Sequence, residues 1–358
     1  MKVIKKIAPL TLLCALAFSS CEDDTATPIG QNVTFKSLGL DGRIVHELDL
    51  VENKLWASTD AGLFVKDLGT NADWTARGLS QKNVKTFIAL EDNLFLASAT
   101  DVNQEEFLIF KSTDGGQSWL ELQSNWGGAT PEPLNDFAWD AATNTLYACG
   151  AGVVATSEDY GETWTPSTGE WQSMASGLAF VSLNPKNGDV WSGGQNAIEG
   201  FMLHRQDKTS GEWQSWTNLL PSPSVGKSIA FSESDPQTIL VGGEDGIIKT
   251  TNNGSSWNRV KEDHTARFYF GLTFDQQVEE RVYAASWDKN FQDPQPLILL
   301  ISNNSGNSWK EYRHAPAQLF GGVWSMIQKS DGNKTRLYLG LYKGGVYEAV
   351  IEEMAATE

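Results

Sequence analysis

Short apolar segments recur along most of the chain, and turn-forming residues separate them. Seven of these segments begin with two large apolar side chains and end with a small one. Each is followed by a loop and another apolar run, such as residues 62–65, 152–155 and 345–348. Runs of this length between Gly, Asn and Asp residues predict β-strands. The seven segments are residues 55–58, 95–98, 146–149, 190–193, 239–242, 282–285 and 337–340.

A polar motif with one fixed spacing, Ser/Thr-x-Asp/Asn-x-Gly-x-Ser/Thr-Trp, occurs four times. The Asp or Asn side chain can accept hydrogen bonds from backbone N–H groups of its own turn, and the Gly can take a positive φ. We expect the Trp to fill the gap between neighbouring sheets. The predicted structural residues are Asp114, Trp119, Asp159, Trp164, Asn252, Trp257, Asn304 and Trp309.

Two degenerate copies of this motif end at Trp74 and Trp216. Successive motif tryptophans lie 41 to 52 residues apart. Short strands at such a period predict radial repetition of small sheets. We therefore predict an all-β fold, a single seven-bladed β-propeller of four-stranded antiparallel blades over residues 32–353, with a tail over 354–358. The seventh copy has three strands, so the N-terminal strand at 32–35 is expected to complete the last blade and leave no open edge.

The N-terminal residues have the pattern of an export signal. Three lysines precede the apolar stretch 7–18, which is too short to span a bilayer as a helix. The stretch ends at Phe-Ser-Ser-Cys, which resembles a bacterial lipobox and implies lipidation of Cys21. The acidic residues 22–24 resemble the surface-export signal of Bacteroidota lipoproteins, which implies a lipid-anchored, outward-facing position on the outer membrane.

We therefore expect a lipoprotein signal peptide over residues 1–20, and a lipidated Cys, an acidic cluster and a tether over 21–31. An ordinary signal peptide with a chance Cys is the alternative. With Cys14 removed and Cys21 lipidated, only Cys149 remains, so no disulfide within one chain is expected.

The net charge of −18 bears on the choice of partner. An acidic surface repels phosphate backbones, so we expect neither nucleic acid nor nucleotide as a ligand. The four histidines have no metal-ligand spacing, and the chain has no phosphate loop or dinucleotide fingerprint. We expect no metal and no cofactor.

The repeated turn motif resembles the Asp-box, or BNR, repeat over nearly the whole predicted propeller. That class includes sialidases, family 74 xyloglucanases, sortilin-type receptors and relatives of a photosystem II assembly factor. The motif is structural in those families, so the resemblance implies no catalytic role for it here. Sialidases carry an Arg-Ile-Pro motif. Its nearest match in this chain is Arg43-Ile44-Val45, which has Val in place of the Pro. Family 74 enzymes join two propellers, whereas this chain has room for one.

Aromatic residues gather in segments that the predicted topology places on one face of the ring. These are the loops between second and third strands and the connections between blades, with long insertions at 123–135, 194–200, 287–296 and 312–322. Flat rings suit the C–H faces of sugars and also anchor protein partners. The candidate ligand-binding residues are Trp126, Trp171, Arg267, Tyr269, Trp287, Phe291, Arg313 and Phe320.

Other aromatic and polar residues near that face have a simpler interpretation. Phe268 and Trp324 are expected to pack under their own loops. His46 and Lys85 fall at the start of innermost strands, where we expect polar side chains bonded to channel water rather than catalytic groups.

The sequence thus favours a non-catalytic cell-surface lipoprotein that binds an extracellular glycan through its aromatic-rich face. A protein-interaction scaffold at the cell envelope is one alternative. A glycoside hydrolase that uses a carboxylate pair is another. Replacing Trp126, Trp171 and Trp287 by Ala is expected to weaken binding and to leave melting nearly unchanged.

Overall fold

A computed structural model describes residues 30–353 except 102, 104–105, 174–176, 199, 218–219, 222–223, 265 and 333. The predicted signal peptide, Cys21, the acidic cluster and the tail over 354–358 lie outside the described residues. Within them, regular secondary structure consists of 28 β-strands. None of the described segments is a helix long and apolar enough to cross a membrane.

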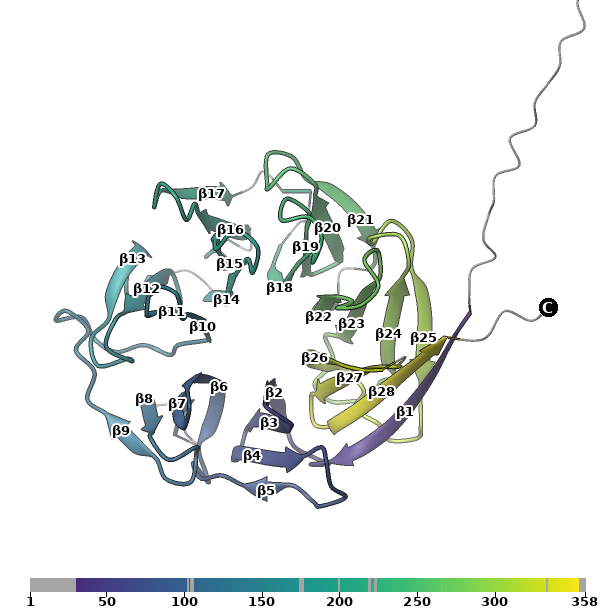
Figure 1. The fold of residues 1–358 in the computed structure, drawn as a ribbon, viewed down its shortest axis with the longest axis horizontal. Coiled ribbons are helices and arrows are strands. Elements are labelled where there is room, and N and C mark those ends of the chain that lie inside the picture. The colour runs from purple at the N-terminus through teal and green to yellow at the C-terminus, as the bar shows by residue number, and fades with distance from the viewer. Residues whose placement is uncertain are drawn as a thin grey trace, which may run out of the picture.

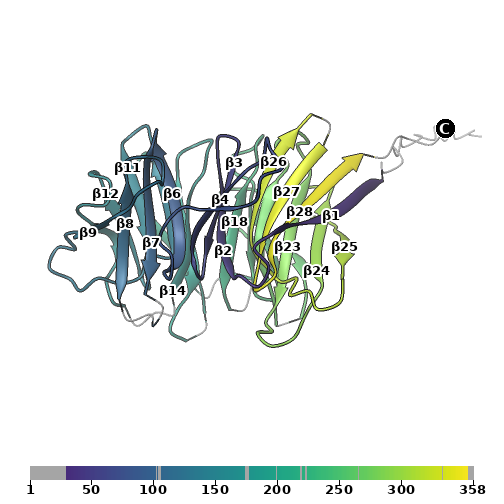
Figure 2. The same cartoon turned by 90° about the horizontal axis from the view of Figure 1, so that it is seen from below.

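The strands form seven four-stranded antiparallel sheets arranged as blades around a common axis (Figure 1). This is the predicted seven-bladed β-propeller. The innermost strands line a cavity on this axis, which we call the central channel. In each blade the first strand lies nearest the channel and the fourth lies on the rim. Seen from the side, the strands run through the thickness of a disc (Figure 2).

Blades 1 to 3 follow the chain order from channel to rim. Blade 1 consists of β2 (Val45–Val51), β3 (Lys54–Thr59), β4 (Gly62–Asp67) and β5 (Thr75–Ala76). Blade 2 consists of β6 (Asn83–Glu91), β7 (Leu94–Thr100), β8 (Phe107–Ser112) and β9 (Leu120–Leu122). Blade 3 consists of β10 (Asp136–Asp140), β11 (Thr145–Cys149), β12 (Val153–Ser157) and β13 (Thr165–Gly169).

Blades 4 to 6 repeat the same order. Blade 4 consists of β14 (Gly177–Leu183), β15 (Val190–Gln195), β16 (Phe201–Gln206) and β17 (Trp213–Thr217). Blade 5 consists of β18 (Gly226–Phe231), β19 (Ile239–Gly243), β20 (Gly246–Thr250) and β21 (Asn258–Glu262). Blade 6 consists of β22 (Arg267–Phe274), β23 (Val282–Asp288), β24 (Leu297–Ser302) and β25 (Lys310–His314).

Blade 7 joins the two ends of the described chain. It consists of β26 (Val323–Asp331), β27 (Lys334–Leu341), β28 (Gly345–Glu353) and, as its rim strand, β1 (Gln31–Gly39). The strand β1 pairs antiparallel with β28, in a register that sets Val33 opposite Ile351. Figure 1 shows them side by side, purple against yellow. The expected closure of the last blade by the N-terminal strand is therefore confirmed.

The repeated polar motif forms the turn between the third and fourth strands of blades 2, 3, 5 and 6. In each copy the Asp or Asn Oδ1 accepts a backbone N–H four residues on, at 2.8 to 2.9 Å. The motif Gly donates its N–H to the Ser or Thr Oγ at the start, and its φ lies between 77° and 88°. The expected turn chemistry is present in all four copies.

The motif tryptophans lie at the junctions between blades. Trp164 is 1% exposed and packs with Leu96 and Ile109 of blade 2 and with Leu146 of blade 3. Trp119 of blade 2 donates its indole N–H to Arg77 O, which follows β5 of blade 1, at 2.7 Å. Burial of these large rings holds neighbouring sheets together, as the sequence predicts.

The innermost strands share an irregularity that positions the candidate site. In blades 1, 2, 4, 5, 6 and 7 the pairing of the first and second strands shifts register, leaving one residue of the first strand without a partner. Such a β-bulge bends its strand and changes the direction in which the side chains point. The bulge residues are His46, Lys85, Ala179, Lys227, Phe270 and Trp324, and Asn135 occupies the corresponding place just before β10 in blade 3.

Candidate functional site

A cavity of about 920 Å³ lies in the central channel. The innermost strands of all seven blades line it, and each bulge residue is part of that lining. Its outer lining includes Gln195, Glu244 and Phe291, which lie in or beside the loops between second and third strands. The cavity therefore reaches the face on which the sequence places the aromatic insertions. We call the outer part of this cavity the channel mouth.

Aromatic rings of blades 6 and 7 form one wall of the channel mouth. Trp287 lies 5.6 Å from Trp324 and 5.1 Å from Phe291, measured between ring centroids. Tyr342 packs on Trp324 at 4.9 Å, and Phe270 stacks on Trp324 at 5.9 Å. We call Phe270, Trp287, Phe291, Trp324 and Tyr342 the aromatic wall. Phe291 is 42% exposed, so the wall presents a ring to solvent at its outer end.

Close backbone approach and one lysine hold the aromatic wall in place. A Cβ added at Gly322 would lie 2.0 Å from Trp287 Cδ1, so the indole needs a glycine beneath it. Lys343 Nζ donates a hydrogen bond of 3.0 Å to Phe291 O and lies 5.0 Å from the centroid of the Tyr342 ring. The turn between β27 and β28 thereby fixes the loop of blade 6 that carries Phe291.

Three lysines project into the channel mouth. Lys227 Nζ lies 5.4 Å from the centroid of the Phe270 ring, and Lys289 Nζ lies 5.9 Å from that of Phe268. Burial lowers the pKa of Lys85. Burial also lowers the pKa of Lys227, the positive charge of Lys289 lowers it further, and Glu244 opposes the shift. Cation–π contacts of this kind favour the charged ammonium.

His46, on blade 1, lies beside Trp324 of the aromatic wall. Its ring lies 5.7 Å from that of Trp324, and its Nε2 lies 2.7 Å from Asn83 Oδ1. Burial, and secondarily the charge of Lys85, lowers the pKa of His46 to about 4. The imidazole is therefore neutral near pH 7 and can offer a ligand a hydrogen bond rather than a charge.

Two carboxylates lie deeper in the channel and fasten neighbouring blades. Glu47 Oε2 accepts Phe87 N–H at 3.0 Å, and Asp136 Oδ2 accepts Val181 N–H at 2.9 Å. Burial raises the pKa of Asp136 to about 7. Burial, and then the nearby charge of Asp136, raises the pKa of Glu47. In blade 7 the hydroxyl of Ser325 serves in the same way and accepts Leu48 N–H at 2.9 Å.

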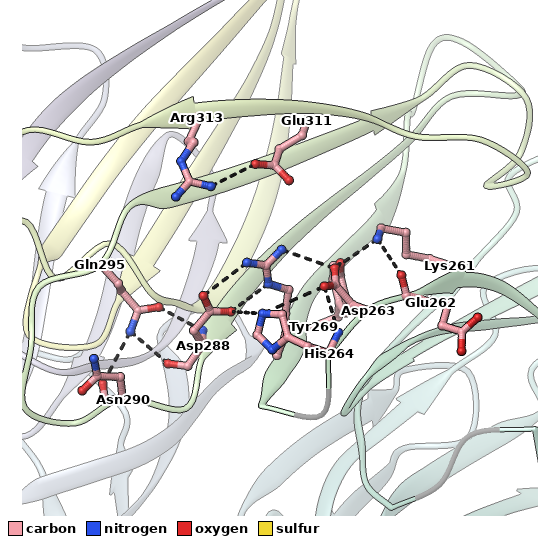
Figure 3. A network of polar contacts seen from close by, with 11 residues as sticks. Lys261, Glu262, Asp263, His264, Tyr269, Asp288, Asn290, Gln295, Glu311 and Arg313 are labelled. Carbon is pink, nitrogen blue, oxygen red and sulfur yellow. Dashed lines mark hydrogen bonds and ion pairs between the residues drawn. The ribbon is translucent and has the colours of Figure 1, made fainter.

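Arg267 and Tyr269, which the sequence offers as ligand contacts, belong to a polar network on blade 6 (Figure 3). The Arg267 guanidinium donates from Nε to Asp288 Oδ1 at 2.7 Å and from Nη1 to Asp263 Oδ2 at 3.3 Å. Tyr269 is 0% exposed and donates its hydroxyl to the same Asp263 oxygen at 2.9 Å. Both side chains have protein partners and brace this part of the blade.

Arg313 lies apart from that network. It pairs with Glu311 at 3.2 Å, and Figure 3 shows this pair separate from Asp263 and Asp288. Phe320, on the connection between blades 6 and 7, lies 5.7 Å from Lys343 Nζ. Neither residue lines the cavity.

Trp126 and Trp171 form a separate aromatic pair at blade 3. Trp126 is 9% exposed and packs on Trp171, with centroids 4.8 Å apart, and on Trp164 at 6.4 Å. The reason is that the chain before Trp126 pairs with the motif turn of blade 3, where Trp164 N–H donates to Asn125 O at 2.9 Å. This turn draws the indole into the core, and neither ring lines the cavity.

The packing argues against the expectation that Trp126→Ala and Trp287→Ala leave melting nearly unchanged. Trp126 is 9% and Trp287 4% exposed, and truncation of buried indoles removes core contacts. Phe268, also buried, packs beneath its loop as expected. Of the eight candidate residues, Trp287 and Phe291 line the cavity.

Sequence reasoning missed Lys227, Phe270, Lys289 and Tyr342. Two of these four, Lys227 and Phe270, occupy the bulge position that His46, Lys85 and Trp324 occupy in their own blades. The distance from this position to the second strand differs between blades, so spacing along the sequence does not reveal the shared position. The nearby Lys289 and Tyr342 follow the second strands of blades 6 and 7.

The described residues contain no group of three His, Cys, Asp or Glu side chains able to hold a metal ion. Cys149 is free and buried, and burial raises the pKa of its thiol. The site is thus built from aromatic, basic and hydrogen-bonding side chains.

No family model matches the sequence, and no curated protein matches it. Solved structures share its fold. A GH74 xyloglucanase from Xanthomonas campestris aligns over 88% of this chain and 53% of its own, with a TM-score of 0.62 and 14% identity. The extracellular domain of a putative hybrid two-component system from B. thetaiotaomicron aligns over 89% of this chain and 40% of its own, with a TM-score of 0.64 and 13% identity.

The chain thus spans about half, or less, of the length of these two proteins. A chain in a structure of the Mitotic Checkpoint Complex has a TM-score of 0.64 and 12% identity, with 98% of this chain and 99% of that one covered. At such identities the similarity establishes the β-propeller fold alone. Proteins as different as these show that the fold does not determine the ligand.

Proposed function

We propose that this chain is a non-catalytic, lipid-anchored surface protein that binds an extracellular glycan in the channel mouth. The aromatic wall is the observation that carries the proposal. Four of its five rings line a concave cavity, and Tyr342 packs against Trp324; the wall ends in the half-exposed Phe291. Flat aromatic faces next to hydrogen-bonding groups are the usual means of holding sugar rings.

Binding without catalysis is favoured by the state of the two channel carboxylates. Glycoside hydrolysis uses one carboxyl group as an acid and another as a base or nucleophile, both turned to the substrate. Here Glu47 and Asp136 each accept a backbone N–H from the neighbouring blade. Those hydrogen bonds hold the ring together and occupy oxygens that a catalytic pair would need.

The proposed location depends on the N-terminal sequence. The apolar stretch over 7–18, Cys21 and the acidic residues 22–24 support export, lipidation and display on the outer membrane. The similarity to an extracellular domain from B. thetaiotaomicron agrees with this location. The polar turns support membership of the Asp-box class.

Affinity electrophoresis tests the proposal. Residues 25–358, which retain every described residue, are run in native gels that contain a panel of polysaccharides. We expect at least one glycan to retard the protein, with no release of sugar on long incubation. Phe291→Ala should weaken that retardation about tenfold, as loss of one stacking ring implies.

Leu120→Ala is the matched control, because Leu120 is 75% exposed on the rim strand β9, far from the channel. It should bind as the parent does, and both variants should melt close to the parent. Free migration in every gel would refute glycan binding. Sugar release would refute the absence of catalysis.

A further inference from the structure

We infer that the channel mouth recognises an anionic glycan, one that carries carboxylate or sulfate groups along its length. This inference rests on the proposed function and names its ligand class. It is carried by the placement of Lys85, Lys227 and Lys289 around one cavity lined by aromatic rings.

The charge of the channel mouth is opposite to that of the chain. The protein has 45 acidic and 27 basic residues, a net charge of −18. Three lysines nevertheless meet in this cavity, contributed by blades 2, 5 and 6. Glu244 is the carboxylate of the outer lining, and it accepts a hydrogen bond from Ser224. At the channel mouth three lysines thus stand against one carboxylate, and a concave surface where one sign of charge predominates raises the local concentration of ligands of the other sign.

Some lysines of the described structure are neutralised by a carboxylate, but these three are not. Lys111, Lys186, Lys208, Lys261 and Lys334 each form an ion pair with a carboxylate. Among the described residues, no ion pair joins Lys85, Lys227 or Lys289 to an acidic side chain. With so many acidic residues in the chain, this arrangement leaves positive charge available to a ligand.

The grouping of these charges is unfavourable in the free protein. The positive charge of Lys289 opposes that of Lys227, and that of Lys85 opposes protonation of His46. Burial disfavours the charged form of Lys85 and Lys227 as well. An anion placed between them would relieve the repulsion and replace part of the lost hydration. Lys85 and Lys227 lie on first strands and Lys289 directly follows β23, so the fold sets their positions for a ligand with several charges.

The deeper carboxylates do not cancel this preference. Glu47 and Asp136 accept backbone hydrogen bonds, and burial raises the pKa of both. A raised pKa means that each carboxyl group carries less negative charge near neutral pH than an exposed one would. Repulsion of an anionic ligand from the depth of the channel is correspondingly weak.

Two matched pairs of polysaccharides test the charge of the ligand. Polygalacturonate is compared with its fully methyl-esterified form, and dextran sulfate with dextran, so that each pair differs in charge on one backbone. We expect the anionic member of a pair to retard the protein and its neutral counterpart to leave it unretarded. The polygalacturonate pair reports carboxylate recognition, and the dextran pair reports sulfate recognition. Raising the salt from 50 to 300 mM should weaken binding severalfold.

The double variant Lys85→Gln/Lys227→Gln should weaken binding of the anionic glycan at least tenfold. Its melting temperature should equal or exceed that of the parent, because the variant removes two partly buried charges and the repulsion of Lys227 by Lys289. The control is Lys36→Gln, an exposed lysine on the rim strand β1, which should bind as the parent does. Equal binding by Lys36→Gln and loss in the double variant would localise the charge effect to the channel.

The outcomes separate this inference from the proposed function. Retardation by neutral and anionic glycans alike, unchanged in the double variant, would overturn the inference and leave glycan binding in place. Retardation by no glycan, with capture by polyglutamate instead, would overturn both in favour of an acidic polypeptide ligand. Retardation by an anionic glycan that the double variant retains would also overturn the inference, since the charge would then lie elsewhere.

Discussion

The motif turns on the rim and the bulges beside the channel occur at equivalent places in successive blades, yet their residues behave in opposite ways. The four turns keep Asp or Asn, Gly and Trp at fixed positions, and their Oδ1 contacts agree within 0.1 Å. The bulges keep the backbone irregularity and vary the side chain from Ala179 to Lys227 to Trp324. One region repeats its chemistry, and the other repeats only its geometry.

This difference separates what builds the ring from what can act in it. A turn residue satisfies backbone groups of its own blade, so the same solution works in every copy. A bulge residue faces the channel, where seven different side chains meet in one cavity. The shared backbone geometry places each of these side chains around the same axis, and their variety brings basic groups and aromatic rings together in one cavity.

The largest effect is expected from breaking the rim. Trp164→Ala removes a fully buried indole at the junction of blades 2 and 3, and should lower the free energy of unfolding by about 3–5 kcal/mol. Chemical denaturation measures this loss. Glycan affinity, measured where the variant is folded, should be unchanged, and Trp164→Phe should lose less stability. A variant that melts like the parent would show that the rim tryptophans do not hold the blades together.

A smaller effect, dependent on pH, is expected inside the channel. The pKa of Asp136 is about 7 in the folded protein and 3.8 in the unfolded chain. The folded state therefore binds more protons between these values, so its stability falls as pH rises from about 4 to about 7. Asp136→Asn keeps an acceptor for Val181 N–H but cannot titrate. The difference in unfolding free energy between parent and variant should change by at most roughly 4 kcal/mol over this window.

The comparison of parent with variant isolates Asp136. His46, with its pKa lowered to about 4, contributes stability that is complete above pH 6.5 and is lost as pH falls through 4, in both proteins alike. Glu47 retains its own raised pKa in both. Glu212→Gln, at an exposed site on blade 4, is the control and should follow the parent. Parallel curves for parent and Asp136→Asn would contradict the assigned shift.

The smallest effect is expected at a single motif turn. Asp159→Ala removes the acceptor for Thr163 N–H and should cost about 1 kcal/mol of unfolding free energy. Asp159→Asn should be nearly neutral, because Asn252 and Asn304 accept the equivalent N–H in their own turns at 2.8 Å. Thermal melting of both variants checks this. Equal losses for Asn and Ala would show that the carboxylate charge, rather than the hydrogen bond, stabilises the turn.

The fold was predictable because its signals are local and repeated. The second-strand segments and the motif turns specify strands and hairpins from a few neighbouring residues, and their period specifies the number of blades. The closing strand was also predictable, since the last repeat lacks one strand and the N-terminal segment supplies it.

The site was predictable only in part, because ligand contact depends on which way a ring turns after the chain has folded. Trp126 and Phe291 both lie in long insertions, yet one stacks under its turn and the other reaches solvent. Arg267 donates hydrogen bonds to Asp263, four residues before it, and to Asp288. Asp288 comes to lie opposite Arg267 only when β22 and β23 pair. Lys227 carries no local motif, and its place in the channel is set by the bulge that forms when β18 pairs with β19.

The rim strand of blade 7 has a consequence for how the protein reaches its folded state. It joins Gln31 to Glu353, so nearly the whole described chain lies between the two partners of this pairing. During synthesis β1 is the first of the described strands to be made, and it remains unpaired until β28, the last of them, has formed. Closing so long a loop costs conformational entropy, and only the contacts of the completed ring offset this cost. A chain interrupted anywhere before β28 keeps an unpaired β1 and an open ring, so the final pairing distinguishes finished molecules from truncated ones.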